Sequence, residues 1–153
     1  HTLLDALEQM AGESTDREIR KAYTQHRKET QGQIRRLERI FKVIGCKPQV
    51  GSCPGIEGLL KEKKTFARER PSDELREFFN VGAGQKVERY EISSYENLID
   101  MADKLGITEA VDLLEQNLLE EEAALNRLKV FASEFDVTEE LEEEPAGEHS
   151  RSR

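Results

Sequence analysis

Long segments of this chain repeat apolar residues at alternating steps of three and four, which is the spacing of one face of an α-helix. The three longest cover residues 15–45, 71–105 and 108–135, and a shorter one covers residues 2–12. Only four prolines interrupt the 153 residues, and 36% of the residues are charged, which favours long helices with a solvent-facing side over a sheet. The pattern predicts an all-α fold.

The connections between these helices set the topology. Residues 46–58 are dense in glycine, proline and serine, which indicates a loop, and residues 59–69 have room for a short helix. Short connections pair neighbouring helices antiparallel, whereas this long one lets the second and third long helices run parallel. We therefore expect an antiparallel four-helix bundle over residues 1–135 with one long crossover connection, the ferritin-like topology. The expected N-caps are Ser14 or Thr15 with Glu18 as capping-box partner, Ser72 or Asp73, and Thr108.

Both ends of the chain depart from this pattern. The first helix is short for a bundle, and the chain begins at His1 rather than at Met, so we expect that the start of this helix has been cut away. Residues 136–153 are charged and poor in apolar residues, which predicts an acidic, disordered tail.

The charge balance limits the classes of partner. The chain carries 32 acidic and 23 basic residues, a net charge of −9. Nucleic acids and anionic membranes are therefore not expected as partners, and a cation is the more natural ligand. No apolar run approaches the roughly 20 residues of a membrane span and no signal peptide is visible, so we expect a cytoplasmic protein. Cys46 and Cys53 are expected to be reduced thiols, with a bridge or half of a metal site as the alternative.

Ionisable residues occupy the middle of the predicted core stripes. In the second helix, His26 and Glu29 lie one turn apart between apolar ends, and Glu88 and Glu91 do the same in the third. In the fourth helix Glu121 replaces a core residue in an otherwise apolar stripe. Buried together, four carboxylates would cost several kcal/mol each unless protons or cations neutralise them. Two divalent metal ions are the economical explanation, and oxygen ligands with one imidazole suit iron or manganese.

Simpler interpretations of the same residues exist. Glu is abundant in this chain, and a small error in the phase of a stripe could place an exposed Glu on it. Tyr95 could bond a ligand or act as a redox-active phenol, although packing in the core with a satisfied hydroxyl is the ordinary expectation. Gly82 and Gly84 are interpreted as residues that permit close helix approach.

Four segments resemble the YciF-like family of the ferritin-like superfamily. They are HRKETQGQIRRLE at 26–38, CPGIEGLLKE at 53–62, AGQKVERYEISSYENL at 83–98 and LGITEAVDLLEQNLLEEE at 105–122. Their order and spacing cover most of the chain and leave out only the acidic tail.

The resemblance implies a ferritin-like bundle, a dinuclear metal centre with iron as the usual metal, a homodimer, and a role in stress responses. The family's helix-two ligands fall on His26 and Glu29, and its helix-three pair falls on Glu88 and Glu91. Its helix-four pair falls on Glu120 and Glu121, of which the core stripe selects Glu121.

The chain departs from the family pattern at two positions. The family's first helix carries a metal-ligating Glu that, by the register of LLDALEQM, would lie immediately before His1. Relatives tend to have Asp where this chain has Leu125, which leaves a second ligand from the fourth helix in doubt.

Two functions follow as hypotheses. The first is a non-haem di-iron or di-manganese carboxylate protein that oxidises iron or removes peroxide under stress, with oxygen or peroxide as its reactant. The second is a non-catalytic helical scaffold or interaction protein that keeps the fold with an incomplete metal site. The two departures from the family pattern favour the second.

Overall fold

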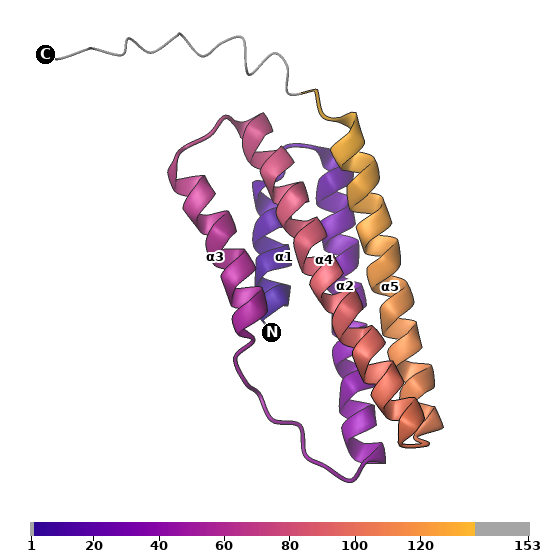
Figure 1. Ribbon diagram of the computed structural model, residues 1–153. Coiled ribbons are helices and arrows are strands. Elements are labelled where there is room, and N and C mark those ends of the chain that lie inside the picture. The colour runs from indigo at the N-terminus through magenta and orange to yellow at the C-terminus, as the bar shows by residue number, and fades with distance from the viewer. Residues whose placement is uncertain (1, 137–153) are drawn as a thin grey trace, which may run out of the picture.

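Five helices make up the computed structural model, which describes residues 2–136 (Figure 1). They are α1 (Thr2–Glu13), α2 (Arg17–Val43), α3 (Pro54–Arg68), α4 (Asp73–Lys104) and α5 (Thr108–Glu134). All regular structure in this described range is helical, so the predicted all-α class is confirmed. The tail predicted over residues 136–153 lies outside the described residues apart from its first residue.

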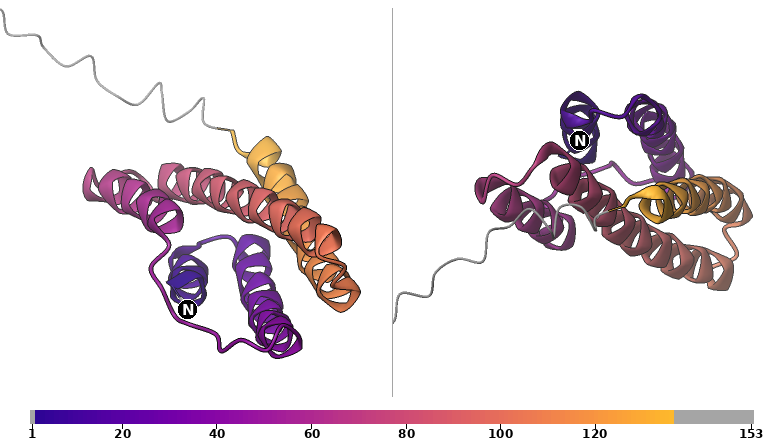
Figure 2. Two further views of the ribbon diagram at one scale, coloured as in Figure 1. Left: turned by 60° about the horizontal axis from the view of Figure 1, so that its bottom comes forward. Right: turned by 90° about the horizontal axis from the view of Figure 1, so that it is seen from above.

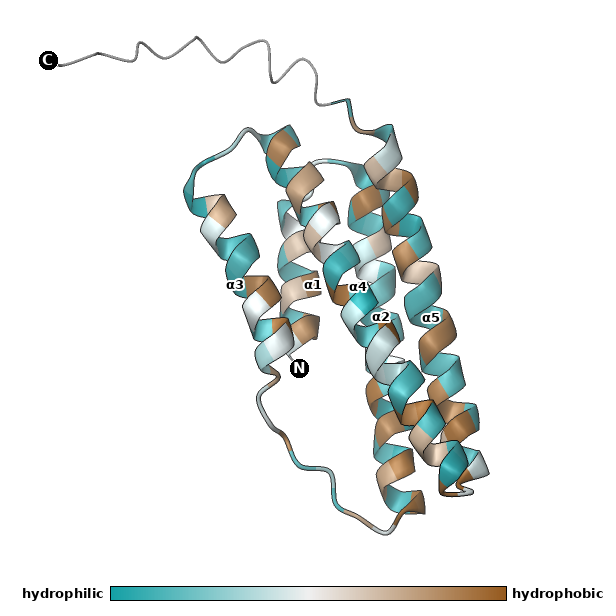
Figure 3. Ribbon diagram, in the orientation of Figure 1, coloured by the Kyte–Doolittle hydropathy of each residue, from teal (hydrophilic) through white to brown (hydrophobic). Residues whose placement is uncertain are grey.

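Four of the helices form the bundle, and α3 lies outside it along α4 (Figures 1 and 2). α4 packs mainly against α5, and α2 packs against α1 and α5. Figure 1 shows α2 and α4 running in the same direction, because the long connection that contains α3 returns the chain to the other end of the bundle. The predicted crossover connection is therefore confirmed. Figure 3 shows hydrophobic and hydrophilic residues interleaved along the helices, as expected when one face of each packs on a core.

Two predicted N-caps are wrong, and the reasons are local. The N-cap of α2 is Asp16, whose Oδ1 accepts hydrogen bonds from the backbone N–H groups of Glu18 and Ile19 at 2.7 and 2.9 Å. The last long helix begins at Thr108 itself, after Ile107 and without a side-chain cap. The prediction for α4 is confirmed, because the Ser72 hydroxyl accepts from the N–H of Leu75.

The connecting helix is longer than predicted, since it begins at Pro54 rather than near residue 59. Proline suits the first turn of a helix, where its missing N–H has no partner to lose. Gly55 then packs on the ring of Tyr90, and a Cβ at this position would lie 2.5 Å from the ring. A partly buried ion pair between Lys63 of α3 and Glu13 of α1, with 2.8 Å between Nζ and Oε2, connects α3 to the bundle.

Apolar residues form two core clusters, one on each side of a polar layer. The first contains Leu7, Met10, Ile19, Tyr23, Val81 and Leu128, and the second contains Tyr95, Ala102, Ala110 and Leu114. Gly84 is buried between helices, where a Cβ would lie 2.9 Å from Leu128 Cδ1, so its predicted packing role is confirmed. Gly82 has open space around its Cα, so the same prediction is wrong there.

The predicted stripes run off the core near the ends of the helices. Alternating steps of three and four place Ile44 on the predicted stripe of residues 15–45 and Leu98 and Leu105 on that of residues 71–105, but these residues are 43%, 41% and 67% exposed. Ile99 packs on the second core cluster in the place expected for Leu98. A strict alternation of threes and fours drifts from the true helical period of 3.6, which explains the error. None of the described helices is long and apolar enough to cross a membrane.

Candidate metal centre

Four of the five predicted ligands meet halfway along the bundle. One ligand atom from each of His26 on α2, Glu88 and Glu91 on α4, and Glu121 on α5 lies within 4.8 Å of the other three. Three of these side chains are buried, and Glu91 is partly exposed at the edge of the group. We call these four residues the mid-bundle cluster. The fifth predicted ligand, Glu29, lies beside the cluster rather than in it.

His26 uses both ring nitrogens. Its Nε2 lies 3.3 Å from Glu88 Oε1 and 3.5 Å from Glu121 Oε2, and its Nδ1 lies 3.1 Å from Glu29 Oε2. Burial alone would lower the pKa of His26, but the hydrogen bonds to Glu29 and Glu88 raise it to about 11. Without a metal, the ring therefore acts as a cation that binds the carboxylates around it.

Glu29 is held by two cationic partners. Besides His26, its Oε2 accepts a hydrogen bond of 2.8 Å from Arg127 Nη2 on α5. The hydrogen bond from His26 lowers the pKa of Glu29 to about 2. A carboxylate that bonds the second nitrogen of a histidine fixes the orientation of that ring, which is the usual arrangement behind a metal-ligating histidine.

The three carboxylates of the mid-bundle cluster do not ionise equally. Burial and the charge of Glu88 raise the pKa of Glu91 to about 8, and burial and the hydrogen bond to Glu88 raise that of Glu121 as well. Burial also acts to raise the pKa of Glu88, but the hydrogen bonds from His26 and Glu121 outweigh it and lower this pKa. The cluster therefore retains protons at neutral pH that a bound cation would replace.

Two carboxylate oxygens of the cluster have no hydrogen-bond partner. They are Glu88 Oε2 and Glu121 Oε2, both fully buried, and only Tyr23 Oη and Asn117 Nδ2 share this state among the side chains of residues 2–136. A buried polar atom without a partner costs stability, so natural structures rarely keep one without a reason. Carboxylate oxygens aimed at one small region beside an imidazole nitrogen are the donor set of iron and manganese. The residues present therefore fit a divalent metal ion.

The sequence matches a known family over almost its whole length. The model of the family described as Domain of unknown function (DUF892) matches residues 1–142. This chain belongs to the DUF892 family. Among curated proteins, the DUF892 protein is similar to Protein YciF of Escherichia coli strain K12, with 34% identity over 122 residues that cover 79% of this chain and 74% of YciF.

Solved structures agree with this family assignment. The DUF892 protein is similar to the crystal structure of the E. coli stress protein YciF, with a TM-score of 0.81 and 32% identity over 86% of this chain and 84% of that one. It is equally similar to YcfI of Rhodopseudomonas palustris, a candidate structural protein, with a TM-score of 0.81 and 39% identity over 84% and 82% of the two chains. The chain is thus a YciF-like protein, and the resemblance seen in its sequence is confirmed.

A polar network behind Glu121 was not predicted from the sequence. Gln33 Nε2 donates to Glu121 Oε1, and Tyr95 Oη donates to Gln33 Oε1 at 3.2 Å. Asn117, which is 0% exposed, accepts a hydrogen bond from Arg36. Gln33 is on the predicted stripe of its helix, so its position was available as a signal. Nothing in the sequence indicated Arg127 as the partner of Glu29.

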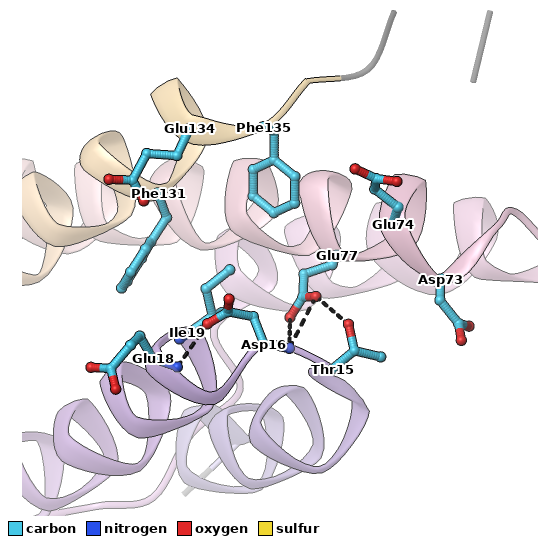
Figure 4. Close-up of a pocket in the computed structure, with 10 residues that line it drawn as sticks. All are labelled: Thr15, Asp16, Glu18, Ile19, Asp73, Glu74, Glu77, Phe131, Glu134 and Phe135. Carbon is cyan, nitrogen blue, oxygen red and sulfur yellow. Dashed lines mark hydrogen bonds between the residues drawn. The ribbon is translucent and has the colours of Figure 1, made fainter. Parts of the chain in front are cut away.

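A second buried carboxylate lies near one end of the bundle of the DUF892 protein. Glu77 accepts a hydrogen bond from the hydroxyl of Ser14. Figure 4 shows its contacts with the Thr15 hydroxyl and with the backbone nitrogen of Asp16, which lies 3.3 and 3.4 Å from its two carboxylate oxygens. It lines an open pocket of about 620 Å³ whose other walls carry Phe131, Phe135 and several carboxylates. Glu77 was not predicted either, although it lies one turn before Val81 on the stripe of α4.

Proposed function

We propose that this protein is a non-haem metal protein that binds two divalent ions, iron in preference to manganese, and acts in stress responses by oxidising iron or removing peroxide. The observation that carries this proposal is that Glu88 Oε2 and Glu121 Oε2 are buried without a hydrogen bond from any described residue, while His26 Nε2 lies 3.5 Å from Glu121 Oε2. A core built for packing alone would place leucines at these positions, because a buried carboxylate oxygen without a hydrogen bond destabilises the fold.

The donor set supports iron or manganese over softer metals. His26 offers one nitrogen, and Glu88, Glu91 and Glu121 offer carboxylate oxygens from two other helices. When bound there, such an ion supplies Lewis acidity and one-electron redox chemistry. The protein's own contribution is to hold the ligands from three helices at one depth and to exclude bulk water from the buried carboxylates.

Glu29 decides whether one ion or two can bind. The mid-bundle cluster provides donors for one ion in its present arrangement, while Glu29 bonds Arg127 and His26 Nδ1. A second ion would draw the Glu29 carboxylate away from Arg127 and into the site. With one ion bound, Glu29 orients His26 instead of ligating metal.

Metal content is the first test of this proposal. Protein purified after growth with iron and manganese should retain at least one ion per chain, and the metal-loaded protein should accelerate iron(II) oxidation or peroxide loss. Replacement of Glu122, which is exposed on α5, by Gln serves as the control for replacement of Glu121 by Gln. Fewer than about 0.3 ions per chain in the wild-type protein would contradict the proposal.

A non-catalytic scaffold is the second candidate. It is favoured by the pairing of His26 with Glu29, Glu88 and Glu121, which neutralises part of the cluster without a metal. Leu125, where the family resemblance implies Asp, favours it as well. Under this function, the metal-loaded protein would have no oxidase or peroxidase activity above that of free metal. A homodimer and a cytoplasmic location, both expected from the sequence, stay predictions that sedimentation and cell fractionation would test.

A further inference from the structure

The hydroxyl oxygen of Tyr23 is buried without a hydrogen bond in the described part of the chain. The residue lies on α2 one turn before His26 and is 3% exposed, and its hydroxyl has no hydrogen-bond partner within residues 2–136. Its ring packs in the first apolar core cluster, but a phenylalanine would fill the same space without burying an unpaired hydroxyl. The packing of the ring therefore does not explain the hydroxyl.

Tyr95 shows how this fold provides a partner for the hydroxyl of another buried tyrosine. It is 7% exposed, on the other side of the mid-bundle cluster, and its hydroxyl donates to Gln33 Oε1 at 3.2 Å. Two buried tyrosines of one core thus differ in a single respect, which is whether the protein itself provides a partner for the hydroxyl.

Two small cavities meet at Tyr23 and Glu88. One, of about 10 Å³, is also lined by His26 and Arg127. The other, of about 20 Å³, lies between α1, α3 and α4, and apart from Tyr23, Glu88 and Lys63 its walls are apolar. The Lys63 ammonium is bound to Glu13, so it does not offer a free charge to this space. Each cavity has the size of about one water molecule.

We propose that Tyr23 donates a hydrogen bond from its hydroxyl to a small, uncharged molecule with an O–O bond, dioxygen or hydrogen peroxide, that enters the cavity beside Glu88. This inference rests on the proposed metal function and adds a residue that positions the reactant. The small volume excludes alkyl hydroperoxides, and the apolar walls disfavour a charged reactant such as superoxide.

The matched variants Tyr23→Phe and Tyr95→Phe test this assignment. In metal-free protein, Tyr23→Phe should leave the urea midpoint unchanged or raise it, whereas Tyr95→Phe should lower it, because only Tyr95 loses a hydrogen bond. In iron(II)-loaded protein, the dissociation constant of nitric oxide, a probe for dioxygen, should rise about fivefold to tenfold in Tyr23→Phe, the value of one hydrogen bond. It should stay within about twofold of the wild-type value in Tyr90→Phe, because Tyr90 is 41% exposed and its ring lies against Gly55 of α3.

Separate reactions with dioxygen, hydrogen peroxide and tert-butyl hydroperoxide identify the reactant. The natural reactant is the one whose reaction is slower in Tyr23→Phe than in the wild-type protein. With the wild-type protein, tert-butyl hydroperoxide should react at least tenfold more slowly than that reactant. Equal rates for the bulky peroxide would overturn the inference, and so would a nitric oxide affinity of Tyr23→Phe equal to that of wild type. A wild-type protein that binds no iron would overturn the metal function itself, whereas normal iron content with unchanged nitric oxide binding would overturn only the role of Tyr23.

Discussion

Two regions of this bundle bury carboxylates, and they treat them in opposite ways. At one end, Glu77 receives two side-chain hydroxyls and approaches a backbone N–H, all from the turn between α1 and α2. In the middle, Glu88 and Glu121 each keep one buried oxygen without a hydrogen bond within residues 2–136, although His26 Nε2 lies 3.5 Å from Glu121 Oε2. Burial is similar in the two places, at 7% exposure for Glu77 and 2% and 0% for the other two.

The difference separates a structural carboxylate from a binding one. A buried carboxylate whose oxygens find donors within the protein strengthens the fold, because its hydrogen bonds are charge-assisted. A buried carboxylate oxygen that receives no hydrogen bond weakens the fold until a donor or a cation binds to it. Replacing the two kinds of carboxylate should therefore have opposite consequences.

The largest expected effect is at Glu77. Glu77→Ala should destabilise the protein by about 3 kcal/mol, because it removes the charged acceptor that binds the hydroxyls of Ser14 and Thr15 and faces the backbone N–H of Asp16. Urea unfolding of the metal-free protein measures this change, and Glu74→Ala, at an exposed position on the same helix, is the control that should stay within about 0.5 kcal/mol. A loss under about 1 kcal/mol would remove the contrast between the two regions.

The second effect is a fall in metal-free stability as the pH rises. The folded-state pKa values of His26 and Glu91 are raised to about 11 and about 8, so the folded protein keeps protons that the unfolded chain has already lost above pH 6.5 and 4.5. Their contribution is complete below those unfolded values and is lost toward pH 11 and 8. Each retained proton changes stability by at most about 1.4 kcal/mol per pH unit, so we expect the two groups together to cost about 2 kcal/mol between pH 7 and 8.

Urea midpoints at pH 7, 8 and 9 measure this slope. His26→Gln should flatten it, because glutamine carries no proton that the folded state could retain. Glu29 has the opposite effect on the pH dependence of stability, because its folded-state pKa is lowered to about 2. Its contribution to the free energy of unfolding is lost only as the pH falls from 4.5 toward 2. Stability that rises between pH 7 and 9 would contradict the protonation pattern described for the mid-bundle cluster.

The cap beside Glu77 should have a smaller effect. Asp16→Ala removes the acceptor for two backbone N–H groups at the start of α2 and should cost about 1 kcal/mol. Thr108→Ala is a matched test, because Thr108 was expected to cap α5 but is its first helical residue, and it should be close to neutral. Equal losses in the two variants would show that the local cap does not contribute to the Glu77 end of the bundle.

The middle of the bundle should show no loss of stability. Glu121→Gln should raise the free energy of unfolding of metal-free protein at pH 7 or leave it unchanged, because the folded state keeps Glu121 protonated whereas the unfolded chain ionises it above pH 4.5, and a neutral glutamine removes the cost of taking up that proton. Calorimetry with manganese(II) should nevertheless show loss of binding in this variant. A loss of several kcal/mol in the metal-free protein would make Glu121 a structural residue like Glu77.

Much of this arrangement is predictable because helical periodicity is local. The spacing of apolar residues alone places His26, Glu88 and Glu121 in the core, and the fold brings their side chains together. The burial of Asn117 and Glu77 was not predicted, because the exact phase of each helix was uncertain. Asn117 lies three residues after Leu114, and Glu77 lies four residues before Val81, so both fit a helical stripe drawn with a slightly different step. Periodicity fixes which face of a helix is buried, but small errors of phase decide individual residues.

The partners of these residues could not be predicted in the same way. Glu29 pairs with Arg127, which is 98 residues away, and Gln33 with Glu121, 88 residues away. Such pairs depend on the relative height and rotation of packed helices, which no single helix encodes. For the same reason, the unpartnered hydroxyl of Tyr23 is a property of the assembled core and not of its own helix.

Anomalous diffraction from crystals grown with manganese(II) is the most direct test of the difference between the two regions. Metal should produce a peak between α2, α4 and α5, about 2.0 to 2.3 Å from His26 Nε2 and from carboxylate oxygens of Glu88 and Glu121. Glu77 should show none, because its hydrogen bonds are complete. The assignment of the mid-bundle cluster as a metal site would be contradicted if crystals grown with saturating manganese(II) showed no peak in the middle of the bundle. It would also be contradicted by a peak at the carboxylates of the pocket beside Glu77 instead.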